Sequence, residues 1–372
     1  MMFAHHMPTR LLVGQGSLDR LADEVVRYSR RCLVVTGRRA LRLGGVLERI
    51  QRDLQSAHIE SVIFDQIEPN PTVETIREGA DFARSQRARW VLGLGGGSAM
   101  DAAKAIALSA VNQDDLRHFF GGVQPAEAPL PVVAIPTTAG TGSEVTAAAA
   151  ITDVAAGDKF AISLPQLFPR LALLDPSLTL TLPENVTVDS GLDALCHAIE
   201  ALFSRRRSVF SDLYARSALD RIIAHLPRAR SQPDDLQARS AMQLAAMFAG
   251  MAVADTDSLV PHLLGHPITV RYDLPHGRAT ALLMPAFLER MQQHFPERTG
   301  FLGRLLGQEA EPPAALRAFI EQLGVAPRLG AYGVHEDDLE QFVGQLADRA
   351  TLERTPGEWD AAALEQLYRQ SL

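Results

Sequence analysis

The second half of the chain carries histidines and an aspartate at spacings that suit a metal ion. Asp193 and His197 are four residues apart, which puts both side chains on one face of a helix. His262 and His266 repeat that spacing, and His276 follows at an expected turn. Imidazoles with a carboxylate suit a borderline ion such as Fe²⁺ or Zn²⁺, whereas Ca²⁺ and Mg²⁺ prefer oxygen ligands. The pattern predicts a transition-metal site, although each histidine taken singly also fits an ordinary packed or surface position.

A glycine-rich turn in the first half could hold a phosphate. Gly95–Ser98 follows the apolar run Trp90–Leu94 and opens a helical segment. Glycines let the backbone approach a phosphate closely, and the N–H groups at a helix start attract negative charge. Ser98 is the expected N-cap, with Asp101 at the third helical position. The motif predicts a pyrophosphate site; a serine-capped structural turn is the alternative, because the spacing is not G-x-G-x-x-G.

A second polar loop, residues 136–146, follows the apolar run Val132–Ile135. Its eleven residues hold five hydroxyl side chains and two glycines. Hydroxyls are neutral hydrogen-bonding groups suited to ribose and phosphate oxygens, although a plain exposed loop would also fit this segment alone. Both loops follow expected strands of one parallel sheet, at the edge where open α/β sheets bind ligands. Together they favour nucleotide binding.

The secondary structure that must position these residues is expected to change from alternating strands and helices to mostly helices near residue 182. Before it, short apolar runs alternate with helical stretches, as in βαβ units. The runs are 33–36, 61–64, 90–94 and 132–135, and the helical stretches are 72–85 and 98–110. After it, helical patterns dominate, and one is expected to end at Pro227. We predict a doubly wound parallel-sheet α/β domain at residues 1–182, an all-α domain at residues 183–372 and a small-molecule cleft between them.

Length, composition and charge narrow the function classes. At 372 residues the chain is long enough for two domains, and its 47% hydrophobic and 22% charged residues are typical of globular proteins. A net charge of −8 offers no basic footprint for nucleic acid. The charge-free segment 240–254 is too short for a membrane span and is expected to be a buried helix. With two cysteines and no visible export signal, we expect a cytoplasmic protein without a membrane partner.

Taken together, these motifs resemble the iron-containing alcohol dehydrogenase family, within the wider group that includes glycerol dehydrogenase and dehydroquinate synthase. The resemblance runs from the strand at Leu33 to Pro275-His276-Gly277. It implies the dehydroquinate synthase-like fold and a homo-oligomer, either a dimer or a larger assembly. It also implies a catalytic histidine near the substrate and nicotinamide, which corresponds to His266. The metal ligands that it implies are Asp193, His197, His262 and His276.

The same resemblance implies which residues bind the dinucleotide. Gly96, Gly97 and Ser98 would contact the pyrophosphate. The other expected cofactor-binding residues are Gly37, Asn70, Asp101, Thr137, Thr138, Thr141, Thr146 and Lys159.

The choice between NAD and NADP depends on the end of the first predicted strand. Many family members have an aspartate there, whereas here Thr36 is followed by Gly37, Arg38 and Arg39. A carboxylate repels a 2′-phosphate, while glycine leaves room for it and arginine can pair with it. Both arginines would also fit solvated positions at a helix start, so both cofactors stay open.

The predicted function is reversible hydride transfer between NAD(P) and a primary or secondary alcohol or aldehyde, assisted by Fe²⁺ or Zn²⁺. His266 is expected to help move a proton. Three alternatives stay open. A maleylacetate reductase-like enzyme would need no metal, although Asp193 argues against it. A hydrolase, or a dehydroquinate synthase-like lyase, would use the cation on another substrate, and a redox-sensing nucleotide binder would show no turnover.

Overall fold

Contacts within the chain divide it into two units. The computed structural model describes residues 3–38, 45–344 and 350–372. One unit spans Met7–Leu182, and the other spans Pro183–Leu372 together with the N-terminal segment that ends at His6. The second unit therefore includes a segment that the sequence places in the first.

The N-terminal segment is held to the helical unit by His5. Its Nδ1 atom lies 2.9 Å from the carboxylate of Asp255, and its ring stacks on Phe210 with 4.7 Å between ring centroids. This ion pair, together with ring contacts of Phe3 with Phe210 and of His5 with Phe210 and Tyr214, holds the segment against helices that lie more than 200 residues further along the chain.

A six-stranded parallel sheet forms the centre of the first unit, with the order β1-β8-β5-β4-β2-β3. Its strands are β1 (Arg10–Val13), β2 (Arg31–Gly37), β3 (Glu60–Ile67), β4 (Trp90–Gly95), β5 (Val132–Pro136) and β8 (Leu171–Leu174). The four apolar runs noted in the sequence are β2 to β5, and this prediction is confirmed. The edge strand β1 and the strand β8 were not predicted because four-residue runs rich in leucine do not distinguish a strand from a helix.

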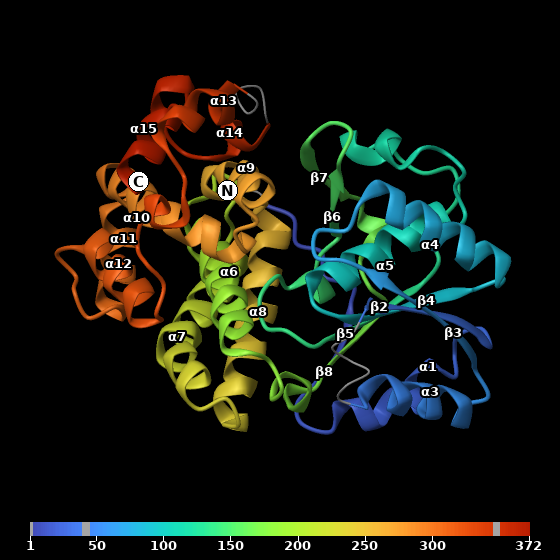
Figure 1. Ribbon diagram of the computed structural model, residues 1–372. Coiled ribbons are helices and arrows are strands. Elements are labelled where there is room, and N and C mark those ends of the chain that lie inside the picture. The colour runs from blue at the N-terminus through green and yellow to red at the C-terminus, as the bar shows by residue number, and fades with distance from the viewer. Residues whose placement is uncertain (1–2, 39–44, 345–349) are drawn as a thin grey trace. The chain divides into compact units, whose positions relative to one another are not determined.

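Helices cover both faces of this sheet (Figure 1). The helices α1 (Leu21–Val25) and α3 (Val46–Ser56) lie on one face, and α4 (Val73–Ser85) and α5 (Gly97–Ser109) lie on the other. Consecutive residues of β4 join separate hydrophobic cores: Val91 packs with the core of α4 and α5, and Leu92 with that of α1 and α3. Because both faces are buried, polar ligands can meet the sheet only at the ends of its strands.

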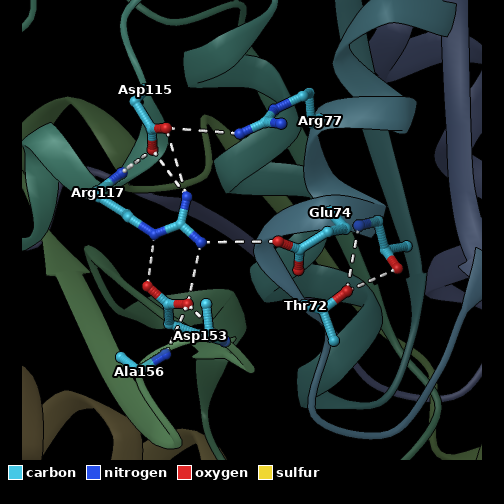
Figure 2. A network of polar contacts seen from close by, with 9 residues as sticks. Thr72, Glu74, Arg77, Asp115, Arg117, Asp153 and Ala156 are labelled. Carbon is cyan, nitrogen blue, oxygen red and sulfur yellow. Dashed lines mark hydrogen bonds and ion pairs between the residues drawn. The ribbon is translucent and has the colours of Figure 1, made fainter.

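An antiparallel hairpin of β6 (Ala148–Asp153) and β7 (Asp158–Ser163) packs beside α5. Figure 2 shows the ionic network that holds its turn. Arg117 donates from Nη2 to Asp153 Oδ1 over 3.0 Å and lies 3.6 Å from Glu74 at the start of α4. Hydrogen bonding to this guanidinium lowers the pKa of Asp153 to about 2. The network therefore fixes the hairpin that carries Lys159.

The second unit is built from helices, and its described residues include no strand. The helices are α6 (Glu184–Phe203), α7 (Val209–Ser231), α8 (Leu236–Thr256), α9 (Val260–Tyr272), α10 (His276–His294), α11 (Pro296–Leu305), α12 (Pro312–Gln322), α13 (Leu339–Gly344), α14 (Ala350–Arg354) and α15 (Ala361–Ser371). Helix α6 is central, since it contacts α7, α8 and α10. The predicted buried helix is α8. Among the described residues, no helix is both long and apolar enough to span a membrane.

The expected helix end at Pro227 is wrong, because α7 continues to Ser231. A proline removes only its own N–H and crowds one carbonyl, and the following turn is retained by the hydrogen bond from Gln232 N to Arg228 O (2.8 Å). The last turn also contributes Ala229 to the buried face.

Candidate metal and cofactor sites

The central helix α6 supplies the first two predicted metal ligands. Asp193 is buried and His197 is half-buried. Their four-residue separation puts both on one face, as the sequence predicted. Buried apolar residues surround them along α6, including Leu192 and Leu195. The carboxylate and the imidazole are therefore polar groups within a largely apolar part of α6.

Helices α9 and α10 bring the remaining histidines to that face. His262 lies in the first turn of α9, and His276 is the first residue of α10 rather than part of a turn, because helical geometry begins directly after Pro275. Helix α10 can approach α6 only because residue 277 is glycine. A Cβ atom on Gly277 would lie 2.7 Å from the Cβ atom of Asp193.

Three of these side chains form a group with the geometry of a metal site. Ligand atoms of Asp193, His262 and His276 all lie within 4.8 Å of one another. His197 is outside that group, but its ring stacks on His262 at 4.4 Å between centroids. The ring of His266 lies 5.3 Å from that of His276. All five predicted side chains thus gather where α6, α9 and α10 meet.

The electrostatics of this group favour a positive charge. Burial lowers the pKa of His262, but the carboxylates of Glu200 and Asp193 outweigh that effect and raise its pKa to about 10. Burial raises the pKa of Asp193, yet His197, His262 and His276 together hold it well below its usual range. Burial also lowers the pKa of His197. A cation would find a buried carboxylate and imidazoles already arranged around one point.

Four atoms of the group form no hydrogen bond among the residues described, and each could supply a lone pair to an ion. Asp193 Oδ1, His197 Nδ1 and both ring nitrogens of His262 are buried, and none has a partner with hydrogen-bond geometry within the part of the chain that the structure describes, although Glu200 Oε2 lies 2.7 Å from His262 Nδ1. His262 Nε2 lies 3.7 Å from Asp193 Oδ1, which is too long for a hydrogen bond. Buried polar atoms of this kind normally have partners, so this group fits an ion.

The glycine turn in the first unit lies between β4 and α5. Gly96 is the N-cap of α5, and Ser98 lies inside the helix, so the expected cap at Ser98 is wrong. The helix starts earlier because Gly96 adopts the extended conformation that an N-cap requires. A Cβ atom on Gly97 would lie 2.5 Å from the side chain of Thr141, so the glycine allows the two predicted loops to touch.

Both loops lie at the carboxyl ends of adjacent strands, as predicted. Thr137 N donates to Gly95 O over 2.9 Å, and the side chain of Thr138 lies against Gly96. Two further predicted residues join them from other segments. Lys159 Nζ donates to Asn70 Oδ1 over 2.9 Å. Asn70 N in turn donates to Ser98 Oγ over 3.3 Å. Four separate segments therefore meet at one edge of the sheet.

Gly37 lies at the same edge, where β2 ends beside β4. Arg38 is exposed, and Arg39 lies outside the described residues. Gly37 is half-buried, and a Cβ atom there would lie 3.5 Å from the carbonyl oxygen of Ile67, an ordinary contact distance.

A family model described as iron-containing alcohol dehydrogenase matches residues 8–176, and a model of the C-terminal part of that family matches residues 187–372. The chain belongs to the iron-containing alcohol dehydrogenase family. It is 33% identical to 1-propanol dehydrogenase of Citrobacter freundii over 98% of this chain and 99% of that relative. An iron-containing alcohol dehydrogenase structure from Thermotoga maritima matches with a TM-score of 0.92 and 32% identity, covering 100% of this chain and 99% of the other.

A further solved structure similar to this dehydrogenase contains a nicotinamide cofactor. It is sulfoacetaldehyde reductase of Bifidobacterium kashiwanohense in complex with NAD⁺, with a TM-score of 0.89, 28% identity and coverage of 100% and 98%. The comparisons confirm the predicted fold and reaction class. The dehydrogenase is a metal-dependent oxidoreductase that transfers hydride between NAD(P) and an alcohol or aldehyde.

Two predicted cofactor residues of the dehydrogenase are used in an internal network. Asp101 Oδ1 accepts a hydrogen bond from Ser143 Oγ (2.6 Å), and Asp101 Oδ2 accepts one from Ala150 N (3.0 Å). Thr146 Oγ1 accepts a hydrogen bond from Lys104 Nζ (3.3 Å). Asp101 is thus hydrogen-bonded to the side chain of Ser143 in the polar loop and to the backbone of β6, and Thr146, at the end of that loop, is hydrogen-bonded to Lys104 of α5.

Two buried charged residues near these sites, Lys104 and Glu200, were not predicted from the sequence. Lys104 is fully buried and also donates to Ser143 Oγ (2.8 Å) and to Ala148 O (2.7 Å). Glu200 is fully buried on α6, with Oε2 2.7 Å from Nδ1 of His262. One signal could have found both residues: each is the only charged side chain in a run of apolar ones, 102–108 and 198–203, and such charges require buried partners.

Proposed function

We propose that Asp193, His197, His262 and His276 hold the divalent cation of this alcohol dehydrogenase. The observation that carries the proposal is the group of Asp193, His262 and His276, with ligand atoms within 4.8 Å of one another. Three imidazoles and one carboxylate suit Fe²⁺ or Zn²⁺. The buried, unused Oδ1 of Asp193 and Nδ1 of His197 support the same set. When bound there, the cation supplies Lewis acidity, which lowers the pKa of an alcohol hydroxyl or polarises an aldehyde carbonyl.

The side chains around this group have separate roles in the proposal. Asp193 contributes the negative charge that makes the buried position favourable for a cation. His266, whose ring lies beside that of His276, moves the hydroxyl proton toward solvent, because it is half-buried and imidazole titrates near neutral pH. The apolar residues of α6 exclude water from the reacting atoms.

The proposed cofactor site is the strand-end edge of the first unit. The backbone N–H groups of Gly97 and Ser98 bind the pyrophosphate at the start of α5. The hydroxyl groups of Thr137, Thr138 and Thr141 line the adjacent loop, and Lys159 adds a positive charge held by Asn70. This arrangement accepts either NAD or NADP, with Gly37 facing the adenosine end in the proposal.

Substrate, location and assembly follow from the same assignment. We propose small primary or secondary alcohols and their aldehydes as substrates. The buried cysteines Cys32 and Cys196 form no disulfide, which suits a reducing cytoplasm. A homo-oligomer, a dimer or larger, stays a prediction from the family resemblance.

Metal analysis and turnover of one variant test the proposal. His262→Ala should remove the bound Fe²⁺ or Zn²⁺ and abolish oxidation of a panel of alcohols with NAD⁺ and NADP⁺. The matched control is His294→Ala, an exposed histidine at the far end of α10, which should keep metal and rate. Full metal content and full turnover in His262→Ala would overturn the assignment. If the wild-type protein binds the metal but turns over no alcohol or aldehyde, the result would favour a lyase or hydrolase instead.

A further inference from the structure

We propose that Glu200 is a positioning residue that fixes His262 as a metal ligand, by holding both the backbone and the ring of that histidine. The inference rests on the proposed metal site, but it concerns a residue outside the ligand set. Glu200 Oε1 accepts the backbone N–H of His262 over 3.1 Å. Its Oε2 accepts the backbone N–H of Leu259 over 2.8 Å and lies 2.7 Å from His262 Nδ1.

The backbone contacts show that α6 caps α9. The first N–H groups of a helix have no partner inside it, and the N-cap residue Leu259 has no side chain that could supply one. Glu200 accepts from Leu259 and His262, Thr355 Oγ1 accepts from Val260 N over 3.2 Å, and Pro261 has no N–H. Every N–H at the start of α9 is therefore accounted for, and His262 begins from a fixed backbone position.

The ring contact selects one tautomer of His262. A carboxylate only accepts hydrogen bonds, so the imidazole nitrogen beside Glu200 Oε2 must carry the proton. A cation must displace one ring proton, and because Glu200 holds the proton on Nδ1, the lone pair becomes available on Nε2, the nitrogen that is 3.7 Å from Asp193 Oδ1. A hydrogen bond on the far nitrogen of a ligating histidine fixes its orientation and raises its basicity. The contact of Glu200 Oε2 with Nδ1 has the distance for such a bond, 2.7 Å, although its angle in this structure falls outside hydrogen-bond geometry. Glu200 thus presents Nε2 to the cation.

An amide at position 200 cannot perform both tasks. Two carboxylate oxygens face three N–H groups: those of Leu259 and His262 and the ring Nδ1–H. In Glu200→Gln, one of the two oxygens becomes an NH₂ group. If that NH₂ group replaces Oε2, it donates a hydrogen bond to Nδ1, so the ring proton moves to Nε2. The NH₂ group also cannot accept the hydrogen bond from the backbone N–H of Leu259. If the NH₂ group replaces Oε1, it cannot accept the hydrogen bond from the backbone N–H of His262. The substitution keeps the side-chain volume and changes only this polarity.

The competing explanation is that Glu200 serves the stability of α9 alone. Thr355→Val provides the matched control, because it removes the hydrogen bond to Val260 N at the same helix end without touching the ring of His262. If only the helix end matters, both variants should weaken metal binding alike. If Glu200 positions the ring, the two variants should differ in metal binding while both lower the melting temperature.

The experiment titrates Co²⁺ into metal-free wild type, Glu200→Gln and Thr355→Val, and measures affinity and the visible absorption bands of the bound ion. We expect about 10- to 100-fold weaker binding and an altered band shape in Glu200→Gln, and a near wild-type affinity and spectrum in Thr355→Val. Unchanged Co²⁺ affinity and spectrum in a folded Glu200→Gln, or equal losses in both variants, would overturn the proposal. Failure of the wild type to bind Co²⁺ would instead overturn the metal site itself.

A second measurement needs no variant at position 200. Wild-type protein with ¹⁵N-labelled histidine rings, loaded with Zn²⁺, reports the protonated nitrogen of each imidazole. We expect a ring protonated at Nδ1 and bound through Nε2, assigned to His262 by through-bond correlation with its own backbone. Binding of His262 through Nδ1 would overturn the role of Glu200, even if Glu200→Gln does not fold.

Discussion

Gly277 lies against the backbone of α6 so closely that a Cβ atom there would be 2.1 Å from the carbonyl oxygen of Asp189. The neighbouring residue, His276, belongs to the proposed metal site. The distance between α10 and α6 is therefore coupled to the position of a ligand.

Gly277→Ala should separate α10 from α6 and displace His276. We expect a loss of stability of about 1–3 kcal/mol, typical of overpacking, and a large fall in metal affinity. The control is Gly300→Ala in α11, where the nearest atoms to an added Cβ lie 3.8 Å away, so stability should hold or rise. Denaturant unfolding and Co²⁺ titration of both variants check this prediction; wild-type affinity in Gly277→Ala would contradict it.

Lys104→Met should weaken the polar loop after β5. The substitution leaves Asp101 without the ammonium group that lies 3.6 Å away and deprives Ser143 Oγ of a donor. Removing one partner of a buried charged pair costs about 3 kcal/mol or more. Adding Asp101→Asn should recover part of that loss, because the unpaired charge is then removed. Urea unfolding of the single and double variants measures the effect, and NADH binding should weaken in parallel.

Glu144 should make stability depend on pH. It is buried in the same loop, and burial raises the pKa of its carboxyl to about 7, although Lys104 opposes this shift. The folded protein therefore retains a proton that the unfolded chain loses near pH 4.5, so the contribution of Glu144 to stability should be greatest below that pH and decline as pH rises to about 7.

Glu144→Gln should flatten this decline and stabilise the protein at pH 8 by up to about 3 kcal/mol. Thermal melts of wild type and variant between pH 4.5 and 8 give the comparison. Glu78→Gln, at an exposed position on α4, should leave the slope as in wild type. The same slope in wild type and Glu144→Gln would show that Glu144 does not cause it.

Gly37→Asp should change the choice of cofactor. A carboxylate at the end of β2 would repel the 2′-phosphate of NADP and accept hydrogen bonds from the ribose hydroxyls of NAD. We expect the ratio of kcat/KM for NADP⁺ to that for NAD⁺ to fall at least tenfold. Paired assays with a single alcohol measure it. An unchanged ratio would place the adenosine end of the cofactor away from Gly37.

The amino-acid sequence by itself determined the local features of this protein. Apolar runs such as Val132–Ile135 need burial on both faces, so they predicted strands of a covered parallel sheet. The spacing of Asp193 and His197 predicted one helix face, and the glycine turn before α5 predicted a phosphate cradle. These inferences depend on neighbours within a few residues, where backbone geometry fixes which side chains share a side.

Only the tertiary structure decided which distant residues meet. Glu200 and His262 are separated by 61 intervening residues, and no periodicity connects them. The sequence does not show which groups the carboxylate of Asp101 contacts. In the folded chain it accepts hydrogen bonds from Ser143 and Ala150. Long-range contacts depend on how whole helices approach one another, and that approach is set by close packing at positions such as Gly277.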